Sequence, residues 1–346
     1  MSATQSLPKT YKAAEIAEKG APFKIVEKNL EQPKDSEVLI KVEACGVCHS
    51  DVIAKESYFP GIPYPIVPGH EVVGRIVALG SRVNTDFFKV GDRVGTGWEG
   101  GHCHECKACR KGAFACCEKG SVNGIFRNGG YAEYVKVREE SVVRIPKDID
   151  SAEAAPLLCA GVTVFNALRN TPAHPGDLVA VQGIGGLGHL AIQFAKQSGF
   201  RVAALSTSED KKSLASQLGA TYYITGSPEE QAEQLAKEGG AQIIIATAPH
   251  APAIGPLVKG LALDGTLLIV AAAGEVTVDT TAMIMKRLSV RAWASGSAID
   301  SEETIKFALQ TGVKCHIEKF KLADVEKAYE RMMSNKARFR AVLTME

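Results

Sequence analysis

The chain lacks an excess of charge of either sign. Its 346 residues include 40 Lys and Arg against 39 Asp and Glu, which gives a formal net charge of +1 at pH 7. A chain this close to neutral offers little electrostatic attraction to nucleic acid or to an anionic membrane surface. We therefore expect neither of these as a partner, and we expect a small molecule as the substrate.

Long apolar runs are also missing. The most apolar stretch, residues 261–274, is interrupted by Asp264 and Gly265, so no segment reaches the roughly 20 residues that cross a bilayer. Residues 1–20 mix Lys with Glu and contain neither an apolar core nor a small-residue cleavage site. This composition does not match a secretion signal or a transit peptide, and it predicts a cytoplasmic protein.

The nine cysteines do not have the spacing of a secreted disulfide framework, because their number is odd and they are clustered. Cys103, Cys106 and Cys109 follow one another in C-x-x-C steps, and the adjacent Cys116 and Cys117 offer a further thiol. Four thiolates in one short loop match the closed tetrahedral shell of a structural zinc ion. We predict such a site here, with only one of the two adjacent cysteines as a ligand.

Two other uses of this cysteine-rich loop fit less well. A nucleic-acid-binding knuckle would have basic and aromatic neighbours, whereas the loop offers Lys107, Arg110, Lys111 and Phe114 in a chain that is neutral overall. A thioredoxin-like redox pair would need a different surrounding fold. Both alternatives rank below structural zinc.

The pattern of apolar residues divides the chain into two parts. A length of 346 residues favours two domains. Short apolar runs broken by Gly and Pro predict strands of an antiparallel, partly barrel-like domain at residues 23–26, 37–42, 72–79, 131–137 and 141–145. Beyond about residue 155, Ala-rich helical patterns alternate with compact strands at residues 178–182, 201–205, 242–246 and 265–270. This alternation predicts a parallel sheet covered by helices.

The last fifty residues can complete either domain. We expect a strand at residues 290–293, helices at about 301–311 and 322–335, and a final strand at 339–343. Periodicity alone does not assign this tail.

A glycine-rich turn follows the expected strand 178–182 and opens a helix. It reads G-x-G-G-x-G and consists of Gly183, Gly185, Gly186, Leu187 and Gly188 around Ile184. Glycines at these places permit a tight turn and let a pyrophosphate approach backbone N–H groups at the positive end of the helix. The strand-turn-helix context predicts an adenine dinucleotide cofactor.

The next strand ends without the acidic residue that would bind the ribose 2′-hydroxyl of NAD. Ser206 stands at that place, followed by Thr207 and Lys211, and these side chains can hydrogen-bond a 2′-phosphate. We therefore favour NADP(H) over NAD(H). Glu209 and Asp210 argue against an anion, and an exposed turn with helix-capping serines is the alternative interpretation.

The motifs together resemble those of the zinc-dependent medium-chain alcohol dehydrogenases, and of the cinnamyl-alcohol and yeast-type branch in particular. The resemblance covers nearly the whole chain. It rests, in order, on Cys48-His49-Ser50-Asp51, Gly69-His70-Glu71, Gly91-Asp92-Arg93-Val94, the cysteine loop, Cys159 and the glycine turn. It implies an α/β protein with a GroES-like, partly antiparallel β-barrel catalytic domain at residues 1–155 and 296–346. It further implies a Rossmann doubly wound parallel sheet at residues 156–295.

The resemblance also implies two zinc ions per chain. Cys48, His70 and Cys159 would bind the catalytic ion, and the family spacing selects Cys117 as the fourth ligand of the structural ion. Taken singly, such residues are more often ordinary buried side chains. In the family pattern two thiolates and one imidazole leave an open position for substrate.

Glu71 would lie next to the catalytic ion as a transient ligand, and Asp51 would orient the imidazole of His70. A helix N-cap is an equally good interpretation of Asp51.

Further residues receive roles only from the resemblance. Ser50 would accept the substrate proton, Thr163 would lie against the nicotinamide, and His49 and Arg340 would approach the pyrophosphate. Each also has an ordinary interpretation as a polar helix or strand residue. Family members often end the proton relay in a histidine where this chain has Ile53, so the proton would leave by another route, through water or His49.

The substrate pocket would be walled by Trp98 with Tyr58 or Phe59, although aromatic residues are more often core. The expected activity is reversible oxidation of a primary alcohol or reduction of an aldehyde. An NAD-dependent alcohol, secondary-alcohol or polyol dehydrogenase is an alternative, as is a non-catalytic dinucleotide-binding or structural protein on this fold. An apolar strand at residues 290–293 would join chains edge to edge into a homodimer or tetramer.

Overall fold

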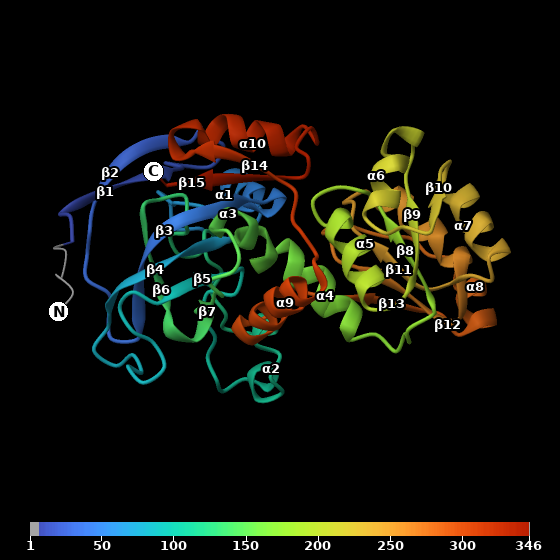
Figure 1. Ribbon diagram of the computed structural model, residues 1–346, viewed down its shortest axis with the longest axis horizontal. Helices are drawn as coiled ribbons and strands as arrows, with labels where there is room; N and C mark the ends of the chain where they lie inside the picture. The colour runs from blue at the N-terminus through green and yellow to red at the C-terminus, as the bar shows by residue number, and fades with distance from the viewer. Residues whose placement is uncertain (1–6, 346) are drawn as a thin grey trace. The chain divides into compact units, whose positions relative to one another are not determined.

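The computed structural model describes residues 7–345, and the chain forms two compact units (Figure 1). Unit 1 contains the chain up to Cys159, the segment Gly296–Leu309 and the chain from Cys315 onward. Unit 2 contains Ala160–Ser295 and Gln310–Lys314. Unit 1 is therefore assembled from separate parts of the sequence, whereas unit 2 is nearly continuous.

Unit 1 is built on a mostly antiparallel sheet. Its strands lie in the order β14 (Ile317–Lys321), β15 (Arg340–Thr344), β3 (Glu37–Val47), β4 (Val72–Leu79), β5 (Arg93–Thr96) and β7 (Val143–Arg144), and β6 (Tyr134–Arg138) also pairs with β3. Strands β1 (Thr10–Glu15) and β2 (Lys24–Asn29) form a separate antiparallel pair. Among these strands, β14 and β15 make a parallel pair.

The core of unit 1 follows from alternation along these strands. Val38, Ile40 and Val42 on β3 are buried in one hydrophobic cluster, which also receives Tyr329 from helix α10 (Val325–Met333). Val and Ile suit this pleated, buried surface because their branched side chains pack against neighbouring strands. Strand β3 thus supports most of the sheet.

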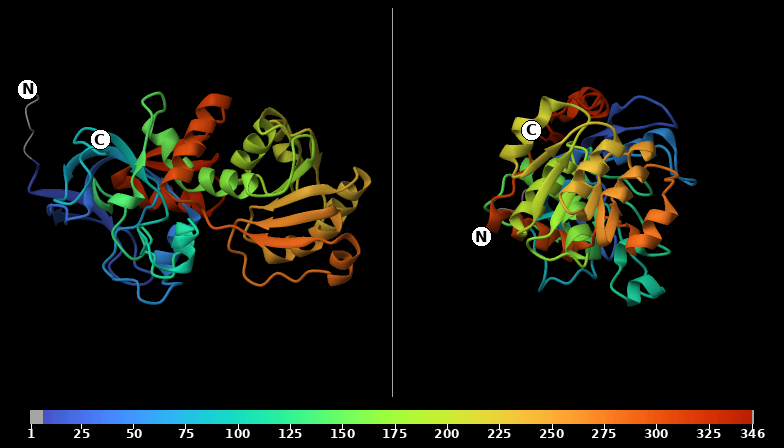
Figure 2. Two further views of the ribbon diagram at one scale, coloured as in Figure 1. Left: turned by 90° about the horizontal axis from the view of Figure 1, so that it is seen from below. Right: turned by 90° about the vertical axis from the view of Figure 1, so that its right-hand side faces the viewer.

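Unit 2 contains a parallel sheet. The order is β10 (Tyr222–Ile224), β9 (Arg201–Leu205), β8 (Leu178–Gln182), β11 (Ala241–Ala246), β12 (Leu261–Ile269) and β13 (Ser289–Ala292). Figure 2 shows these strands side by side in its left panel. The chain order reverses between β8 and β11, which makes the carboxyl end of β8 the topological switch point where dinucleotides bind in such sheets.

Helices cover both faces of the parallel sheet (Figure 1). On one face α4 (Ala160–Arg169) packs against α5 (Gly188–Gln197), and the rings of Phe165 and Phe194 are 5.1 Å apart. On the other face α7 (Pro228–Lys237), η7 (Gly255–Gly260) and α8 (Thr280–Lys286) pack against one another and on β12. The central strands β8, β9 and β11 are almost wholly apolar and buried, as strands covered on both faces require.

Shorter helices connect these elements. They are η1 (His49–Asp51), α1 (Val52–Glu56), α2 (Lys107–Arg110), η2 (Phe114–Cys116), η3 (Glu139–Ser141), α3 (Ser151–Ala154), η4 (Ala155–Leu158), η5 (Glu209–Lys211), α6 (Lys212–Gln217), η6 (Ala251–Ala253) and η8 (Leu322–Asp324). The longer α9 spans Ala298–Thr311.

No single helix within residues 7–345 is long and apolar enough to cross a membrane. The segments Ser151–Leu158 and Ala160–Arg169, broken at Cys159, meet that length and composition only as a pair, and most of their residues are buried.

The expected strands of the second half are confirmed. The ranges 178–182 and 201–205 coincide with β8 and β9, and β11 and β12 begin one and four residues before the expected starts. The expected strand 131–137 is shorter, because β6 begins at Tyr134 while the backbone of Tyr131 bonds to Pro68 and Ala14 outside the sheet. The expected helix 322–335 is a short η8 followed by α10.

Candidate active site

Three segments of unit 1 bring the candidate catalytic ligands together. Cys48 directly follows β3 and caps η1, while His70 and Glu71 directly precede β4. Because β3 and β4 are antiparallel neighbours, the end of one lies beside the start of the other. Cys159 follows η4, which packs on both strands. The four side chains form one buried group of metal-type donors.

The donors fit a zinc ion. The Sγ atoms of Cys48 and Cys159 are 3.9 Å apart, close to the roughly 3.8 Å that two thiolates take around a tetrahedral ion with Zn–S bonds of about 2.3 Å. One donor atom from each member of the group lies within 4.8 Å of all the others. Both ring nitrogens of His70 are buried without a hydrogen-bond partner among the described residues. Nδ1 has the carboxylate of Asp51 at 3.2 Å, so Nε2 is the nitrogen left without a polar neighbour of this kind. A buried ring nitrogen left without a partner is expected where a metal would complete its shell.

Neighbouring buried groups shift the pKa values of Cys48 and His70. The Cys159 thiol hydrogen-bonds to Cys48 and, with the positive charge of His70, holds the pKa of Cys48 well below its usual range against the effect of burial. Burial disfavours the charged imidazole of His70, but the negative charges of Asp51 and Cys48 raise its pKa. The group therefore concentrates negative charge around the unpartnered nitrogen, which favours a cation.

Asp51 contacts the site through both of its oxygens. Its Oδ1 lies 3.2 Å from Nδ1 of His70, so the other ring nitrogen is left for a metal. Its Oδ2 accepts hydrogen bonds from the Cys48 N–H at 2.9 Å and from the Tyr131 hydroxyl at 2.6 Å. The sequence left a choice between orienting His70 and acting as a helix N-cap. Asp51 is the N-cap residue of α1, but its side chain makes no capping hydrogen bond there; it completes the capping box of η1 through the Cys48 N–H instead. The carboxylate is thus in place to orient His70.

Tyr131 was not foreseen as part of this site. Its side chain is fully buried, and burial together with the charge of Asp51 raises the pKa of its phenol well above the usual value, so the hydroxyl remains a donor. The sequence signal was present in Gly129-Gly130-Tyr131, where two glycines precede a large ring. Glycines next to a buried aromatic residue indicate close backbone approach.

Glu71 is paired with Arg340, which lies on β15. Nη2 of Arg340 donates to Oε1 of Glu71, and both side chains are buried. Burial raises the pKa of Glu71 to about 7, although Arg340 acts in the opposite direction. Oε2 of Glu71 has no partner among the described residues and faces the backbone at Gly46, where a Cβ would lie only 1.8 Å from it. The sequence did not reveal this ion pair. The expected approach of Arg340 to a pyrophosphate stays a prediction.

The cysteine loop forms the second group of donors. Its four thiols come from Cys103, Cys106, Cys109 and Cys117, with Sγ–Sγ distances of 3.5 to 3.9 Å, and Cys116 is exposed. Backbone N–H groups of Cys103 and Cys106 point at thiol sulfurs at 3.4 Å. This geometry fits a tetrahedral zinc ion with no open position.

A histidine and a glutamate support the start of this loop. Nδ1 of His102 lies 3.0 Å from Oε1 of Glu99, and the imidazole stacks on Phe114 at 4.1 Å. Glu99 and His102 are both buried. Sequence reasoning did not single out this pair, because neither residue belongs to the C-x-x-C pattern.

The aromatic residues expected to wall a substrate pocket differ in position. The ring of Trp98 meets that of His70 edge to face at 5.0 Å, so it lies beside the donors. Phe59 stacks on Phe126 at 6.3 Å, and Tyr58 is 64% exposed. Of the three, Trp98 therefore has a direct contact with the metal-type group.

The expected proton-relay residues lie on η1 and α1. Ser50 lies on η1 between Cys48 and Asp51, His49 is exposed, and Ile53 is on α1. The proton-relay role of Ser50 stays a prediction.

In unit 2 the glycine turn lies at the carboxyl end of β8. Gly183 has φ of +88°, and a Cβ on Gly188 would lie 1.8 Å from the carbonyl oxygen of Gly183. A side chain is excluded there, whereas a Cβ on Gly185 would meet no atom within 4 Å. Leu187 precedes α5, and Thr163 is buried on α4. The turn thus leaves open space at the N-terminus of α5, as binding of a pyrophosphate requires.

Comparison with known proteins agrees with these features. Residues 34–147 match the family model described as "Alcohol dehydrogenase GroES-like domain", and residues 186–333 match "Zinc-binding dehydrogenase". The alcohol dehydrogenase notN of Aspergillus sp. (strain MF297-2) is 47% identical over 341 residues, which cover 99% of this chain and 100% of the relative. This chain belongs to the zinc-dependent medium-chain alcohol dehydrogenase family.

Solved structures show the same fold in this dehydrogenase. The cinnamyl alcohol dehydrogenase SbCAD4 from Sorghum bicolor superposes with a TM-score of 0.86 at 31% identity, covering 97% of this chain and 98% of that one. The CAD from Helicobacter pylori complexed with NADP(H) gives 0.86 at 27% identity, with the same coverage. The predicted fold class, a GroES-like domain with a Rossmann sheet, and the predicted enzyme class are both confirmed.

The residues expected to bear on cofactor choice in this dehydrogenase follow β9. Ser206 and Thr207 come directly after the strand, and no carboxylate occupies its end. Nζ of Lys211 donates to the carbonyl oxygen of Ile184 at 2.9 Å, which brings the cation to the glycine turn. Glu209, the acid that argued against an anion, is 3.2 Å from Lys212.

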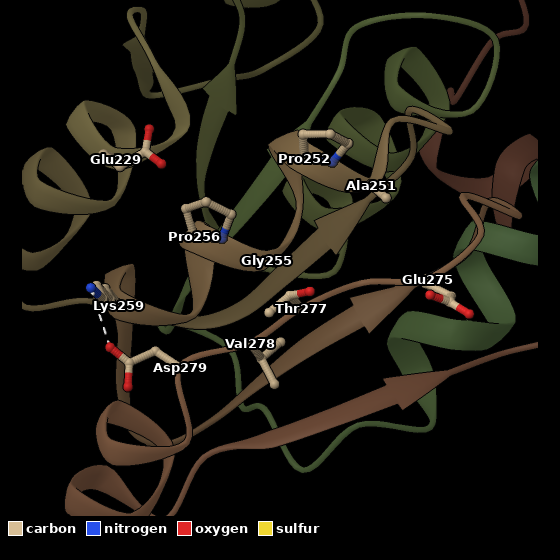
Figure 3. Close-up of a pocket in the computed structure, with 10 residues that line it drawn as sticks. All are labelled: Glu229, Ala251, Pro252, Gly255, Pro256, Lys259, Glu275, Thr277, Val278 and Asp279. Atoms are coloured by element: carbon tan, nitrogen blue, oxygen red, sulfur yellow. Dashed lines mark ion pairs between the residues drawn. The ribbon is translucent and has the colours of Figure 1, made fainter.

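A separate hollow of about 520 Å³ lies on unit 2 (Figure 3). Its lining includes Pro252 and Pro256 on one side and Thr277 on the other, and an ion pair of 3.2 Å joins Lys259 to Asp279 at its rim. None of the residues expected to bind the cofactor or the metals lines this hollow. It is therefore distinct from the glycine turn.

Proposed function

We propose that this dehydrogenase transfers hydride between NADP(H) and a primary alcohol or aldehyde, with one catalytic and one structural zinc ion per chain. The observation that carries the proposal is the buried group of Cys48, His70 and Cys159, in which Nε2 of His70 has no partner. Three protein ligands leave the open position that a catalytic zinc requires.

The residues of the site would divide the work among them. When bound there, zinc would supply a Lewis acid that polarises the oxygen of the substrate. Asp51 would keep the imidazole of His70 in the orientation that leaves Nε2 for the metal. Ser50 would accept the proton of the alcohol as a general base relay and pass it on. Since Ile53 cannot carry it, the proton would leave through water or His49.

The preference for NADP(H) rests on the residues after β9. Ser206 and Thr207 offer hydroxyl donors where an acid would repel a 2′-phosphate, and Lys211 brings a positive charge to the same turn. The likeness to the Helicobacter pylori CAD complexed with NADP(H) supports this choice. The ring of Trp98 beside His70 supports an apolar substrate.

The decisive experiment measures zinc per chain and then compares NADPH with NADH on a panel of aliphatic and aromatic aldehydes. We expect two zinc ions and a kcat/KM at least about tenfold higher with NADPH, since one lost charge-assisted hydrogen bond contributes about 1.5–3 kcal/mol. A preference for NADH would refute the cofactor proposal. Absence of turnover with two zinc ions bound would refute the catalytic one.

A variant sharpens the cofactor test. Ser206→Asp places a carboxylate where NAD-binding sheets carry one, so we expect the preference to move toward NADH. Ser216→Asp adds the same charge at an exposed position of α6 and serves as the control. If both variants shift the preference equally, net charge and not position decides it.

We also propose that the chain forms a homo-oligomer through β13. This edge strand is exposed along its length, and the nearby Ile284 and Met285 on α8 are each 77% exposed. An edge strand beside apolar side chains is suited to pairing with a second copy. Sedimentation would test it, with Val290→Lys expected to shift the protein to monomer.

The free thiols would require a reducing compartment, which supports a cytoplasmic location.

A further inference from the structure

The carboxylate of Asp51 is completely buried beside the candidate catalytic ligands. One oxygen faces Nδ1 of His70, and the other accepts from the backbone of Cys48 and from the hydroxyl of Tyr131. The Tyr131 contact, at 2.6 Å, is the shorter of the two hydrogen bonds. A short hydrogen bond from a neutral donor to a buried carboxylate is among the stronger ones in proteins.

The ring of Tyr131 is fixed against the segment that carries His70. Its backbone N–H donates to the carbonyl oxygen of Pro68 at 3.0 Å, and Gly130 N–H donates to Gly69 at 2.8 Å. Gly69 has φ of +97°, and a Cβ there would lie 2.4 Å from the Tyr131 ring. The ring therefore rests on bare backbone next to His70, so its hydroxyl has little freedom to move away from Asp51.

We propose that Tyr131 is a positioning residue of the catalytic metal site. Its phenol fixes the carboxylate of Asp51, and through that carboxylate it fixes the imidazole of His70 in the orientation that aims Nε2 at the metal. Tyr131 touches neither substrate nor cofactor in this scheme. The inference depends on the proposed assignment of Cys48, His70 and Cys159 to a catalytic zinc.

The competing explanation is that the phenol only satisfies a buried carboxylate and fills space. Both explanations predict some loss of stability when the hydroxyl is removed, so stability does not separate them. The positioning role predicts in addition an effect confined to one of the two metal sites. The loop of Cys103 to Cys117 is then an internal control within the same chain.

The test uses Tyr131→Phe, which removes the hydroxyl and keeps the ring. Zinc release to a chelator is followed in the purified protein, and the phase of the catalytic site is assigned with Cys159→Ala. We expect about tenfold faster release from the catalytic site, the lower end of the range for groups that support a ligand, and unchanged release from the cysteine loop. In the cobalt-substituted protein, the visible bands of the catalytic site should shift.

Tyr64→Phe is the matched control. Its hydroxyl donates to the backbone carbonyl of Ala54 in the same unit, so the variant also loses a phenol hydrogen bond, in this case one to a neutral, partly buried acceptor. We expect wild-type release from both sites and an unchanged cobalt spectrum. If Tyr131→Phe and Tyr64→Phe accelerate release alike, or if Tyr131→Phe accelerates both of its sites equally, the effect is general loosening and the proposal is wrong.

A double-mutant cycle checks the route of action. If the phenol works only through the carboxylate, Tyr131→Phe has no further effect on release once Asp51→Ala is present, because alanine leaves the phenol no side-chain acceptor at that position. Full additivity of the two changes overturns the proposed route. A wild-type protein with one zinc ion, in the loop alone, would instead refute the proposed function, so the two failures are distinguishable.

Discussion

The two groups of metal donors in unit 1 are built in opposite ways. Cys103, Cys106, Cys109 and Cys117 come from one loop, in which three of them are half-buried and Cys109 is buried. Cys48 and Cys159 are separated by 111 positions and meet, with His70, in a fully buried place. The loop needs little beyond its own backbone to gather four thiols, whereas the buried group depends on the pairing of β3 with β4 and on the packing of η4.

This difference matches the proposed work of each site. Four thiolates close the shell of an ion and leave no place for a substrate. The buried group has three candidate ligands together with Glu71, and Glu71 is paired with Arg340. Burial also strengthens every electrostatic interaction in the site because the local dielectric is low. We infer that the donors proposed to act in catalysis come from distant parts of the sequence, whereas the donors proposed to support the fold come from one short loop.

The largest expected effect on turnover comes from the buried group. Cys159→Ala removes a candidate ligand at a site that the fold assembles, and we expect kcat/KM to fall by on the order of 1,000-fold or more, as loss of a Lewis acid implies. Zinc content should fall from two to one per chain. If the variant keeps its activity with one zinc ion, the buried group is not the catalytic site, and the roles proposed for the two donor groups are wrong.

Ser50→Ala should have the next largest effect. Removal of a proton-transfer group costs on the order of 100-fold in kcat or more, while Ser50 is not a member of the donor group, so zinc content should remain at two. Steady-state kinetics and metal analysis on one preparation measure both. Wild-type turnover in this variant would remove the serine from the relay.

Cys106→Ser should separate support from catalysis. Loss of a structural ion destabilises a domain by roughly 4 kcal/mol, so the apparent melting temperature should drop by about 10 °C. At low temperature the folded variant should retain turnover within about twofold, because its buried group is intact. A variant that stays folded and has lost all activity would show that the loop acts on catalysis directly.

Cys116→Ser should have the smallest effect. This thiol is exposed, and it is not part of the group formed by its neighbour Cys117. We expect two zinc ions, unchanged melting and unchanged turnover, whereas Cys117→Ser should behave like Cys106→Ser. If the two results are exchanged, Cys116 is the ligand.

The sequence predicted the features of this structure that depend on residues close together in the chain. The C-x-x-C steps indicated the loop, the apolar runs located β8 and β9 to the residue, and the glycines marked the turn at the end of β8. These features depend on neighbours in sequence, and a single sequence displays them directly. The resemblance then supplied the separated ligands.

Partners that are distant in sequence stayed hidden. Tyr131 and Asp51 are 80 positions apart, and Arg340 and Glu71 are 269 apart. The periodicity of apolar residues does not predict that these polar and charged side chains are buried, and it does not say which of them meet. The same reason left the tail unassigned by pattern, since β15 joins unit 1 through its pairing with β3 and β14.

The placement of β15 has a consequence for the order in which the protein is made. This strand is near the C-terminal end of the chain and lies between β14 and β3, and it carries the arginine that pairs with Glu71. During synthesis, nearly all of unit 2 emerges before β15 does, and domains that are complete can fold while translation continues. Until β15 is made, the sheet around the donor group has an open edge beside β3, and the carboxylate of Glu71 lacks its partner Arg340.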